Sequence, residues 1–244
     1  MSNPKPQLAA VFIAKDAASS IGRGLKSVRR LADEVIVVVD TTTSDETAEI
    51  AKAEGARVFR RKFTDFSDQK NYAVSKAKGE WVLALDADEE ISAQLAKEIK
   101  SVLTQTDVVG FLVSRQNYIF GKLIRHANWE PSADTHIWLW RKRAGRWIGA
   151  VHEEVMVQGQ VKRLKGYKIH RNYKSVEQFI AKMNDYTSRE TTPANPIGEF
   201  GRRYIWHLGF LDGWHGLFLS YLQAIYHLIV WVKLWEKKTL RSVS

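Results

Sequence analysis

Hydrophobic and polar positions follow two different periods along the first hundred residues. Short apolar or β-branched runs predict strands, and apolar residues three or four positions apart predict helices. The expected strands cover residues 8–15, 34–40, 57–61 and 80–86, and the expected helices cover 19–31, 44–56, 67–79 and 92–103. Strands that alternate with helices indicate βαβ units, so the predicted fold is α/β with a mostly parallel sheet.

Small polar residues and glycine set the expected helix ends. Ser44 or Asp45 can cap the helix at 44–56, and Gly55 can end it. Ser92 can cap the helix that starts there, and Ser175 can cap a later one over residues 175–190.

The pattern changes near residue 107, where strands follow one another without helices between them. The expected strands cover residues 108–121, 135–142, 146–157 and 164–173, with a hairpin turn at the segment RAGR, residues 143–146. After the helix at 175–190 comes a connector rich in Pro and Gly, residues 191–201, and then a hydrophobic, aromatic tail.

The tail contains a long apolar segment. From Leu217 to Trp235 there is a single Lys and no acid, which approaches the length that spans a bilayer. Gln223, Tyr226 and His227 interrupt this segment, and basic residues flank it. These features favour a helix that lies in the membrane interface. A helix packed on the rest of the chain or on another subunit is the alternative.

Charge is distributed unevenly over the 244 residues. The formal net charge is +10, yet residues 1–100 hold as many acidic as basic side chains, so the whole excess lies in residues 101–244 together with most of the tryptophan. A basic, aromatic half predicts binding to anionic lipid, a phosphorylated substrate or single-stranded nucleic acid. The chain has no cysteine, which excludes disulfides and thiolate metal sites. No basic segment followed by an apolar run begins the chain, so no signal peptide is expected.

Two of the predicted strands end in aspartate. VIVVVD ends in Asp40, and WVLALD ends in Asp86, which is followed by Ala87 and Asp88. Ligands of parallel sheets bind at the carboxyl ends of strands. A pair of carboxylates there can hold Mg²⁺ or Mn²⁺, or one can bind metal and the other a ribose, whereas a purely structural reading needs only polar strand ends. Glu89 and Glu90 are expected to flank the next helix, where its dipole favours negative charge.

Three segments in order resemble glycosyltransferase family 2, whose members have the GT-A fold. They are AVFIAKD (10–16), EVIVVVDTTTSDETAEIA (34–51) and SDQKNYAVSKAKGEWVLALDADE (67–89). The later RWIGAVHEE (146–154) and IHRNYKSVEQFIAKMNDYT (169–187) resemble a subgroup typified by bacterial lipopolysaccharide inner-core β-1,4-glucosyltransferases. The resemblance implies a Rossmann-like nucleotide-diphospho-sugar transferase fold with a mixed, mostly parallel sheet and a C-terminal helical, membrane-associating appendage.

The resemblance also implies roles for residues in the first half. Asp40 and Asp16 match positions that hold the nucleoside, and Lys70, with Gln69 beside it, is expected to face the donor. Asp86 and Asp88 match the DxD pair, with Asp88 as the metal ligand and Asp86 on the metal or the ribose. His170 is expected to complete the Mg²⁺ or Mn²⁺ site, although a lone His after a strand is often structural. The family's usual DSGSTD reads DTTTSD here, so a glycine of that loop is missing.

Inverting transfer also needs a base for the acceptor hydroxyl. The resemblance points to Glu153, which follows His152, with Glu154 and Asp134 as further candidates; a surface acid pair at a strand end is the structural alternative. The basic run at residues 141–143 could bind phosphate or could be a solvated strand end.

These observations together predict an inverting, metal-dependent hexosyltransferase. It would move a hexose from a UDP-sugar, or another nucleotide-diphospho-sugar, to a glycan or glycolipid in bacterial envelope or lipopolysaccharide synthesis. The catalytic domain is expected over 1–190, with a nucleotide-sugar half at 1–106 and acceptor-side strands at 107–174. Residues 191–244 would form helices at the cytoplasmic face of the inner membrane, with no nucleic-acid partner.

Two other functions compete with this prediction. A nucleotidyltransferase also uses acids and a metal, but its Gly-rich basic loop after the first strand is poorly matched by AKDAASSIGRG, residues 14–24. A non-catalytic module could instead use the basic half to bind membrane or nucleic acid.

Overall fold

The computed structural model of the protein describes residues 7–105, 107–149 and 153–243. The chain divides into two compact units. The first, here the sheet unit, comprises Met1–Arg115 and Thr135–His170; the second, here the helical unit, comprises Gln116–Asp134 and Arg171–Ser244. The predicted helix at 175–190 groups with the helical unit, and the domain boundary at residue 190 stays a prediction.

Parallel strands form one half of the main sheet. They are β1 (Leu8–Ala14), β2 (Glu34–Asp40), β3 (Arg57–Arg61) and β4 (Trp81–Asp86), in the order β3-β2-β1-β4. β1 pairs in parallel with β2 and with β4, and β2 pairs in parallel with β3. The carboxyl ends of β1, β2 and β4 therefore lie next to one another at one edge of the sheet.

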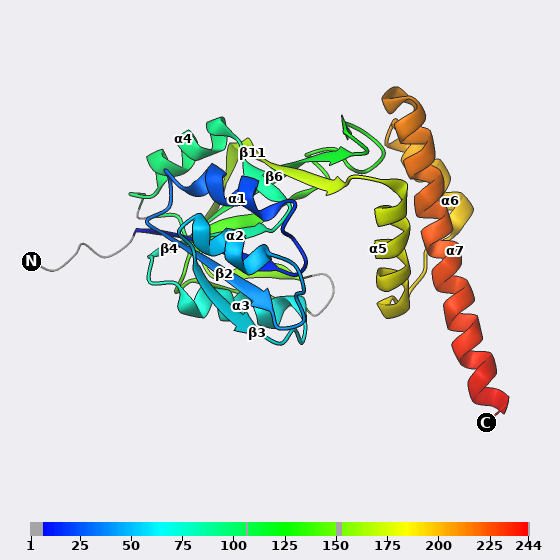
Figure 1. Cartoon of the computed structure of the whole chain (residues 1–244). Helices are drawn as coiled ribbons and strands as arrows, with labels where there is room; N and C mark the ends of the chain where they lie inside the picture. The colour runs from blue at the N-terminus through cyan, green and yellow to red at the C-terminus, as the bar shows by residue number, and fades with distance from the viewer. Residues whose placement is uncertain (1–6, 106, 150–152, 244) are drawn as a thin grey trace, which may run out of the picture. The chain divides into compact units, whose positions relative to one another are not determined.

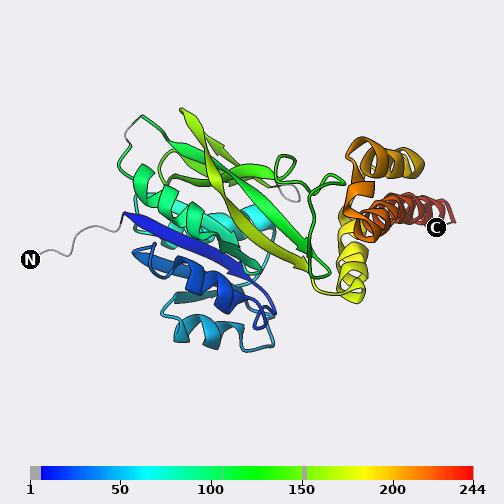
Figure 2. The same ribbon diagram turned by 90° about the horizontal axis from the view of Figure 1, so that it is seen from above.

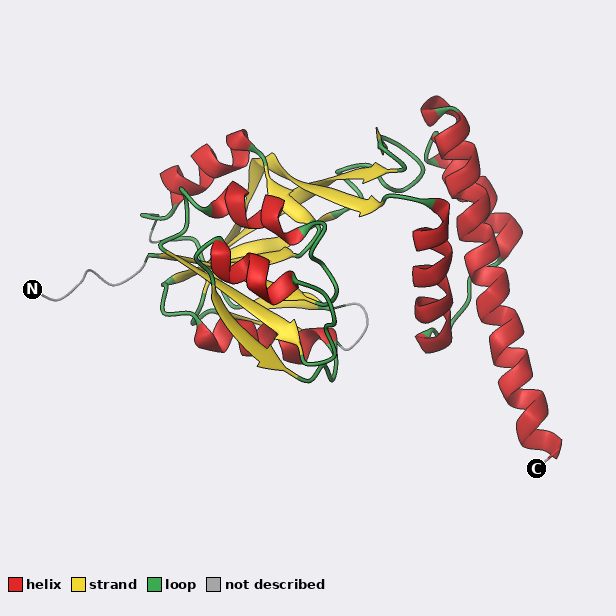
Figure 3. Cartoon of the chain, in the orientation of Figure 1, coloured by secondary structure: helices red, strands yellow, loops and turns green. Residues whose placement is uncertain are grey.

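The helices of the sheet unit are α1 (Ile21–Val28), α2 (Thr47–Ala53), α3 (Phe66–Lys76) and α4 (Ala93–Val102), drawn against the strands in Figures 1 and 3. Right-handed crossovers put α1 and α2 on one face; the chain then reverses direction across the sheet, which puts α3 on the other.

The predicted helix ends are largely confirmed. Ser92 accepts a hydrogen bond from the N–H of Leu95 at the start of α4, and Ser175 accepts one from the N–H of Gln178 at the start of the helix predicted over 175–190. Gly55 has a positive φ of 83°, which favours glycine. The predicted cap of α2 is wrong: its N-cap residue is Glu46, which makes no side-chain cap, and Asp45, one position earlier, accepts the N–H of Thr47.

Antiparallel strands complete the sheet. They are β5 (Glu89–Ile91), β6 (Gly110–Ile119), β7 (Lys122–Leu123), β8 (Thr135–Arg141) and β11 (Val161–Tyr173). β8 pairs with β4, and the order continues β8-β6-β11-β5, with the long β6 and β11 side by side in Figure 2. The mixed sheet is thus confirmed. The hairpin turn predicted at residues 143–146 is only partly correct: the turn covers residues 142–144, and the strand after it, β9 (Gly145–Ile148), pairs with β10 (Glu154–Val157) in a separate two-stranded sheet.

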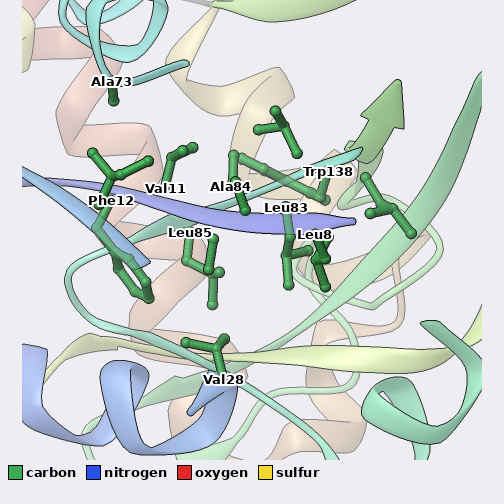
Figure 4. Close-up of a cluster of buried hydrophobic side chains, with 14 of the residues drawn as sticks. Leu8, Val11, Phe12, Val28, Ala73, Leu83, Ala84, Leu85 and Trp138 are labelled. Carbon is green, nitrogen blue, oxygen red and sulfur yellow. The ribbon is translucent and has the colours of Figure 1, made fainter. Parts of the chain in front are cut away.

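The core of the sheet unit lies on both faces of the central strands. Figure 4 shows side chains of this core, among them Leu8, Phe12, Leu83 and Leu85 of β1 and β4 and Trp138 of β8; all five are at most 3% exposed. Strands covered on both faces are continuously apolar rather than alternating, which is the pattern of β1, β2 and β4 in the sequence.

The helical unit has its own small core. It contains α5 (Val176–Arg189), α6 (Pro196–Gly201), a π-helical turn η1 (Arg202–Trp206), a 3₁₀ turn η2 (Gly209–Asp212) and α7 (Trp214–Val243). α7 packs along α5 and α6, and the buried residues of this core are Ile119, Ile124, Phe179, Met183 and Leu219. By length and composition alone, Trp214–Leu240 of α7 could cross a bilayer: its most apolar stretch of 18 residues has a mean hydropathy of 1.4, and 17% of that stretch is buried.

Candidate active site

Polar residues gather where β1 and β2 end. Asp40 is the last residue of β2 and is nearly buried, and its Oδ1 accepts the N–H of Thr42 at 2.8 Å. Asp16 follows β1 with a positive φ of 45°, and its Oδ1 accepts the N–H of Ser44 at 2.9 Å. Asp16 therefore ties the loop after β1 to the loop after β2, so the two acids predicted for the nucleoside share one edge.

The missing glycine of the DTTTSD loop has no conformational consequence here. Among the described residues with positive φ, none lies between 41 and 46. Asp45 instead fixes the loop, because its carboxylate accepts the N–H of Ala18 at 2.9 Å and that of Thr47 at 3.0 Å.

Lys70 of α3 joins two of the predicted site residues. Its Nζ lies 3.0 Å from Asp86 Oδ1 and 2.8 Å from Glu153 Oε1. The same Nζ lies 4.5 Å from the ring centre of Trp147, within cation–π range. Burial alone would lower the pKa of Lys70, but the two carboxylates outweigh it and raise that pKa. Lys70 is therefore charged at neutral pH and brings together segments 83 residues apart.

Asp86 ends β4 in a strongly positive environment. Arg115 Nη2 lies 3.6 Å from its Oδ2. Burial would raise the pKa of Asp86, but Lys70, Arg115 and Lys168 outweigh burial and hold it well below the usual range. Asp86 is thus a carboxylate at any physiological pH.

Asp88 and His170 form the second half of the predicted metal site. His170, on β11, is nearly buried, and its Nε2 lies 3.4 Å from Asp88 Oδ1. The two come together because β11 pairs with β5, with His170 opposite Glu89. Within the described residues, no group of three or more His, Cys, Asp or Glu side chains is arranged to hold a metal.

The expectation that Glu89 flanks the next helix is wrong. Glu89 does not flank a helix N-terminus, since it begins β5 and is 1% exposed. Its carboxylate pairs with Lys168 of β11, which is 0% exposed, and with Arg115 Nε at 2.8 Å. Burial lowers the pKa of Lys168 to about 8, against the opposing effect of Glu89.

Arg115 and Lys168 were not among the predicted site residues, and neither was Trp138. The Trp138 ring centre lies 3.3 Å from Lys168 Nζ and 4.4 Å from Arg115 Cζ. The only signal for Lys168 in the sequence is its position two residues before His170 in the strand predicted at 164–173, which puts both on one strand face. The structure confirms that face, since alternate positions from 164 to 172 are buried, but the partners of Lys168 follow from tertiary pairing.

Three other candidates are exposed or have other partners. Glu154 is exposed on β10. Asp134 belongs to the helical unit, where its Oδ2 accepts from Asn117 Nδ2 at 2.9 Å. Gln69 donates to the Arg61 carbonyl.

One residue of the basic run at 141–143, Arg141, has structural partners. Arg141 pairs with Glu80 and lies over the ring of Trp81, which indicates a structural role for this residue. His152, which precedes Glu153, lies outside the described residues.

The arrangement of the sheet defines the class of protein. It has the GT-A fold of nucleotide-sugar glycosyltransferases. It is similar to the crystal structure of Staphylococcus aureus TarS, residues 1–349, in complex with UDP-GlcNAc, with a TM-score of 0.50 and 13% sequence identity over 89% of this chain and 79% of that one. At that identity the likeness concerns the fold alone.

The family follows from sequence comparison. The model of glycosyl transferase family 2 matches residues 10–158, and the chain belongs to this family. An uncharacterized glycosyltransferase of Rickettsia typhi is 29% identical over 199 residues, 75% of this chain and 66% of the relative, so the chain spans slightly less than two thirds of that protein. A lipopolysaccharide core biosynthesis glycosyltransferase, LpsC of Rhizobium meliloti, is 24% identical over 98% of this chain and 96% of its own length.

Proposed function

We propose that this chain is an inverting glycosyltransferase that moves a hexose from a nucleotide-diphospho-sugar, a UDP-hexose, to a glycan or glycolipid acceptor. The observation that carries the proposal is the buried contact of Lys70 with Asp86 and Glu153, which joins a candidate donor residue to a candidate base. The TarS structure of the same fold is described as a complex with UDP-GlcNAc, which supports a UDP-sugar donor. Family membership favours this function over a nucleotidyltransferase or a binding module.

The donor side of the site is assigned to four residues. Asp40 and Asp16 hold the nucleoside at the ends of β2 and β1, and Asp86 receives the ribose or the diphosphate end. Lys70 is buried between two acids and supplies positive charge where the leaving diphosphate would lie.

Glu153 is the proposed base. In an inverting transfer the acceptor oxygen attacks the anomeric carbon while the bond from that carbon to the diphosphate oxygen breaks, and the acceptor hydroxyl loses its proton. Glu153 takes that proton. Its carboxylate accepts a hydrogen bond from Lys70 at 2.8 Å, which fixes the position of this carboxylate beside Asp86.

The chemistry of Asp88, Asp86 and His170 suits a divalent cation, Mg²⁺ or Mn²⁺, although these three described side chains are not arranged as a metal site in the structure. Carboxylate oxygens suit both ions, an imidazole nitrogen suits Mn²⁺ better than Mg²⁺, and such ions commonly take their remaining ligands from substrate phosphates and water. Because Asp86 also faces Lys70 and Arg115, Asp88 and His170 would be the principal protein ligands. When bound, the ion would neutralise the charge that develops on the leaving diphosphate.

The acceptor is proposed to be an envelope glycan or glycolipid, with the chain at the cytoplasmic face of the inner membrane. The full-length similarity to LpsC supports the lipopolysaccharide core as the acceptor class. Every exposed large hydrophobic side chain of the described residues except Met156 belongs to the helical unit, with Trp206 82% and Trp214 72% exposed. Apolar surface on this scale marks an interaction site.

Surface charge in the helical unit fits an anionic lipid surface. Its exposed acids are Glu177, Asp185 and Glu236, whereas its exposed basic residues are Lys122, Arg125, Arg171, Lys174, Arg189, Arg202, Lys237 and Lys238. Anionic lipids attract such an excess of cations, at about 1 kcal/mol for each Lys or Arg near the surface.

Two measurements on the catalytic proposal separate its parts. A thermal-shift screen of the full chain with UDP, GDP and CMP, each with Mn²⁺, should give stabilisation by one nucleotide that depends on the metal. Asp88→Ala should abolish metal-dependent donor turnover while the protein stays folded. Full activity in that variant would contradict the assignment of Asp88 as a metal ligand. Stabilisation by no nucleotide, together with salt-sensitive binding to oligonucleotides, would favour a binding module instead.

Vesicle flotation tests the membrane proposal. The full chain should float with vesicles that contain phosphatidylglycerol and far less with pure phosphatidylcholine. Trp206→Ser with Trp214→Ser should reduce flotation, whereas Met156→Ser, an exposed apolar residue of the sheet unit, should not. Equal flotation of the two variants would contradict the assignment of this surface, and a dimer in light scattering would point to a second copy as its partner.

A further inference from the structure

Glu89 is a buried acid directly beside the candidate donor residues. It begins the three-residue strand β5, at the edge of the sheet next to β11, and only 1% of it is exposed. A carboxylate in such a place is costly unless cations and hydrogen bonds compensate it.

Two basic side chains compensate Glu89 from the interior. Lys168 of β11 is fully buried, pairs with Glu89 and also donates to the carbonyl oxygen of Ala84 at 3.2 Å. Arg115 of β6 brings its Nε within 2.8 Å of Glu89 Oε1. Both cations also lie against the ring of Trp138, which helps to fix their positions.

The same carboxylate also reaches the donor residues. Glu89 Oε2 accepts the backbone N–H of Asp86 at 2.8 Å. Arg115, through its Nη2, lies 3.6 Å from the Asp86 carboxylate. Glu89 and Arg115 therefore hold both the backbone and the side chain of Asp86, at the turn that carries Asp88.

We propose that Glu89 is a positioning residue, held by Lys168 and Arg115, that fixes Asp86 and the turn after it for the nucleotide-diphospho-sugar. This inference rests on the proposed function. A buried ion pair is often replaceable by apolar residues without loss of stability, so stability alone is a weak reason for this one. Groups that orient the direct ligands of a site change its affinity about 10- to 100-fold when they are removed.

A matched pair of variants tests the inference. Glu89→Gln/Lys168→Met and Glu89→Leu/Lys168→Met both remove the ion pair between residues 89 and 168, and in both Arg115 keeps Asp86 as its acidic partner. Only the first keeps an oxygen that can accept the Asp86 N–H. Calorimetric titration of each full-length variant with UDP, with and without Mn²⁺, should give about tenfold or greater weakening for the Leu variant relative to the Gln variant. Both variants should have similar melting temperatures.

The outcomes are distinguishable. If the wild-type chain binds none of the nucleotides, both the proposed function and this inference are wrong. A wild-type chain that binds UDP, with equal affinities in the two double variants, overturns the positioning role alone. If the Leu variant does not fold, Arg115→Met is the alternative: it leaves the Glu89–Lys168 pair in place and removes the contact of the Arg115 guanidinium with the Asp86 carboxylate. This variant should bind UDP about tenfold more weakly than the wild type. An unchanged UDP affinity would overturn the inference.

Discussion

Replacement of Glu199 by Gln tests how far one buried carboxylate stabilises the helical unit. Glu199 lies on α6 and is 6% exposed. Its oxygens accept hydrogen bonds from Arg202, at 2.8 and 2.9 Å, and from Arg203. Burial alone would raise the pKa of Glu199, but the two guanidinium groups outweigh it and lower that pKa to about 2.

The size of the effect follows from this pKa. The ordinary value is 4.5, so the shift to about 2 corresponds to about 3 kcal/mol. A lowered pKa means that the unfolded chain binds the proton more readily than the folded one. The stabilisation is therefore fully present above pH 4.5 and is lost as the pH falls from about 4.5 to about 2. The guanidinium groups stay charged over this whole range.

Urea unfolding followed by far-ultraviolet circular dichroism measures the effect. At pH 7 the Glu199→Gln variant should be less stable than the wild type by about 3 kcal/mol, and this difference should shrink as the pH is lowered through 4.5. Glu236→Gln, at an exposed acid of α7, is the control and should change stability by less than about 0.5 kcal/mol. If the stability difference between the wild type and the Glu199→Gln variant stays constant from neutral pH down to about pH 2.5, the reasoning is refuted.

Two further predictions concern the sheet unit. Gly166→Ala should destabilise the protein by about 2–3 kcal/mol in thermal unfolding, because an added Cβ would lie 2.5 Å from the backbone N and Cα of Leu95. The control is Gly201→Ala, which has open space around it and should be tolerated. Equal losses of stability in both variants would contradict the packing argument. Lys70→Met should cost about 3 kcal/mol at pH 7, since it leaves Asp86 and Glu153 without their shared cation. The loss should diminish in acid, because Lys70 helps to hold the pKa of Asp86 low in the folded chain; a loss independent of pH would show that packing rather than charge is responsible.

The parallel half of the fold could be predicted from the sequence because its signals are local. A β-branched run such as residues 34–40 is too short for a helix and becomes β2 with the same bounds. Ser92 and Ser175 cap their helices as expected, since a cap depends on a residue and its neighbours three positions on. The carboxyl edge follows from strand order, so Asp40 and Asp86 could be predicted to lie at one edge of the sheet.

The interior charges of the site could not be predicted in the same way. Arg115, Lys168 and Glu89 meet because β6, β11 and β5 are neighbours in an antiparallel arrangement, and that order is not written in any local pattern. Four acids in five positions suggested a helix N-terminus for Glu89, whereas pairing with β11 makes it a strand residue whose side chain points inward. The pairing of β5 with β11 therefore determined the structure at Glu89, against the local preference of acidic residues for helix N-termini.

The charge balance of the site also bears on how a donor would bind. The acids Asp86, Glu89 and Glu153 are already paired with Lys70, Arg115 and Lys168. A nucleotide diphosphate would bring further negative charge into this partly buried, already neutral cluster, where uncompensated charge is costly. A divalent cation that enters with the diphosphate and is held by Asp88 and His170 would cancel most of that charge. The balance therefore supports the proposal that donor and metal bind together, and UDP affinity in chelator should be at least about tenfold weaker than in Mn²⁺; equal affinities would mean that the side chains alone neutralise the diphosphate.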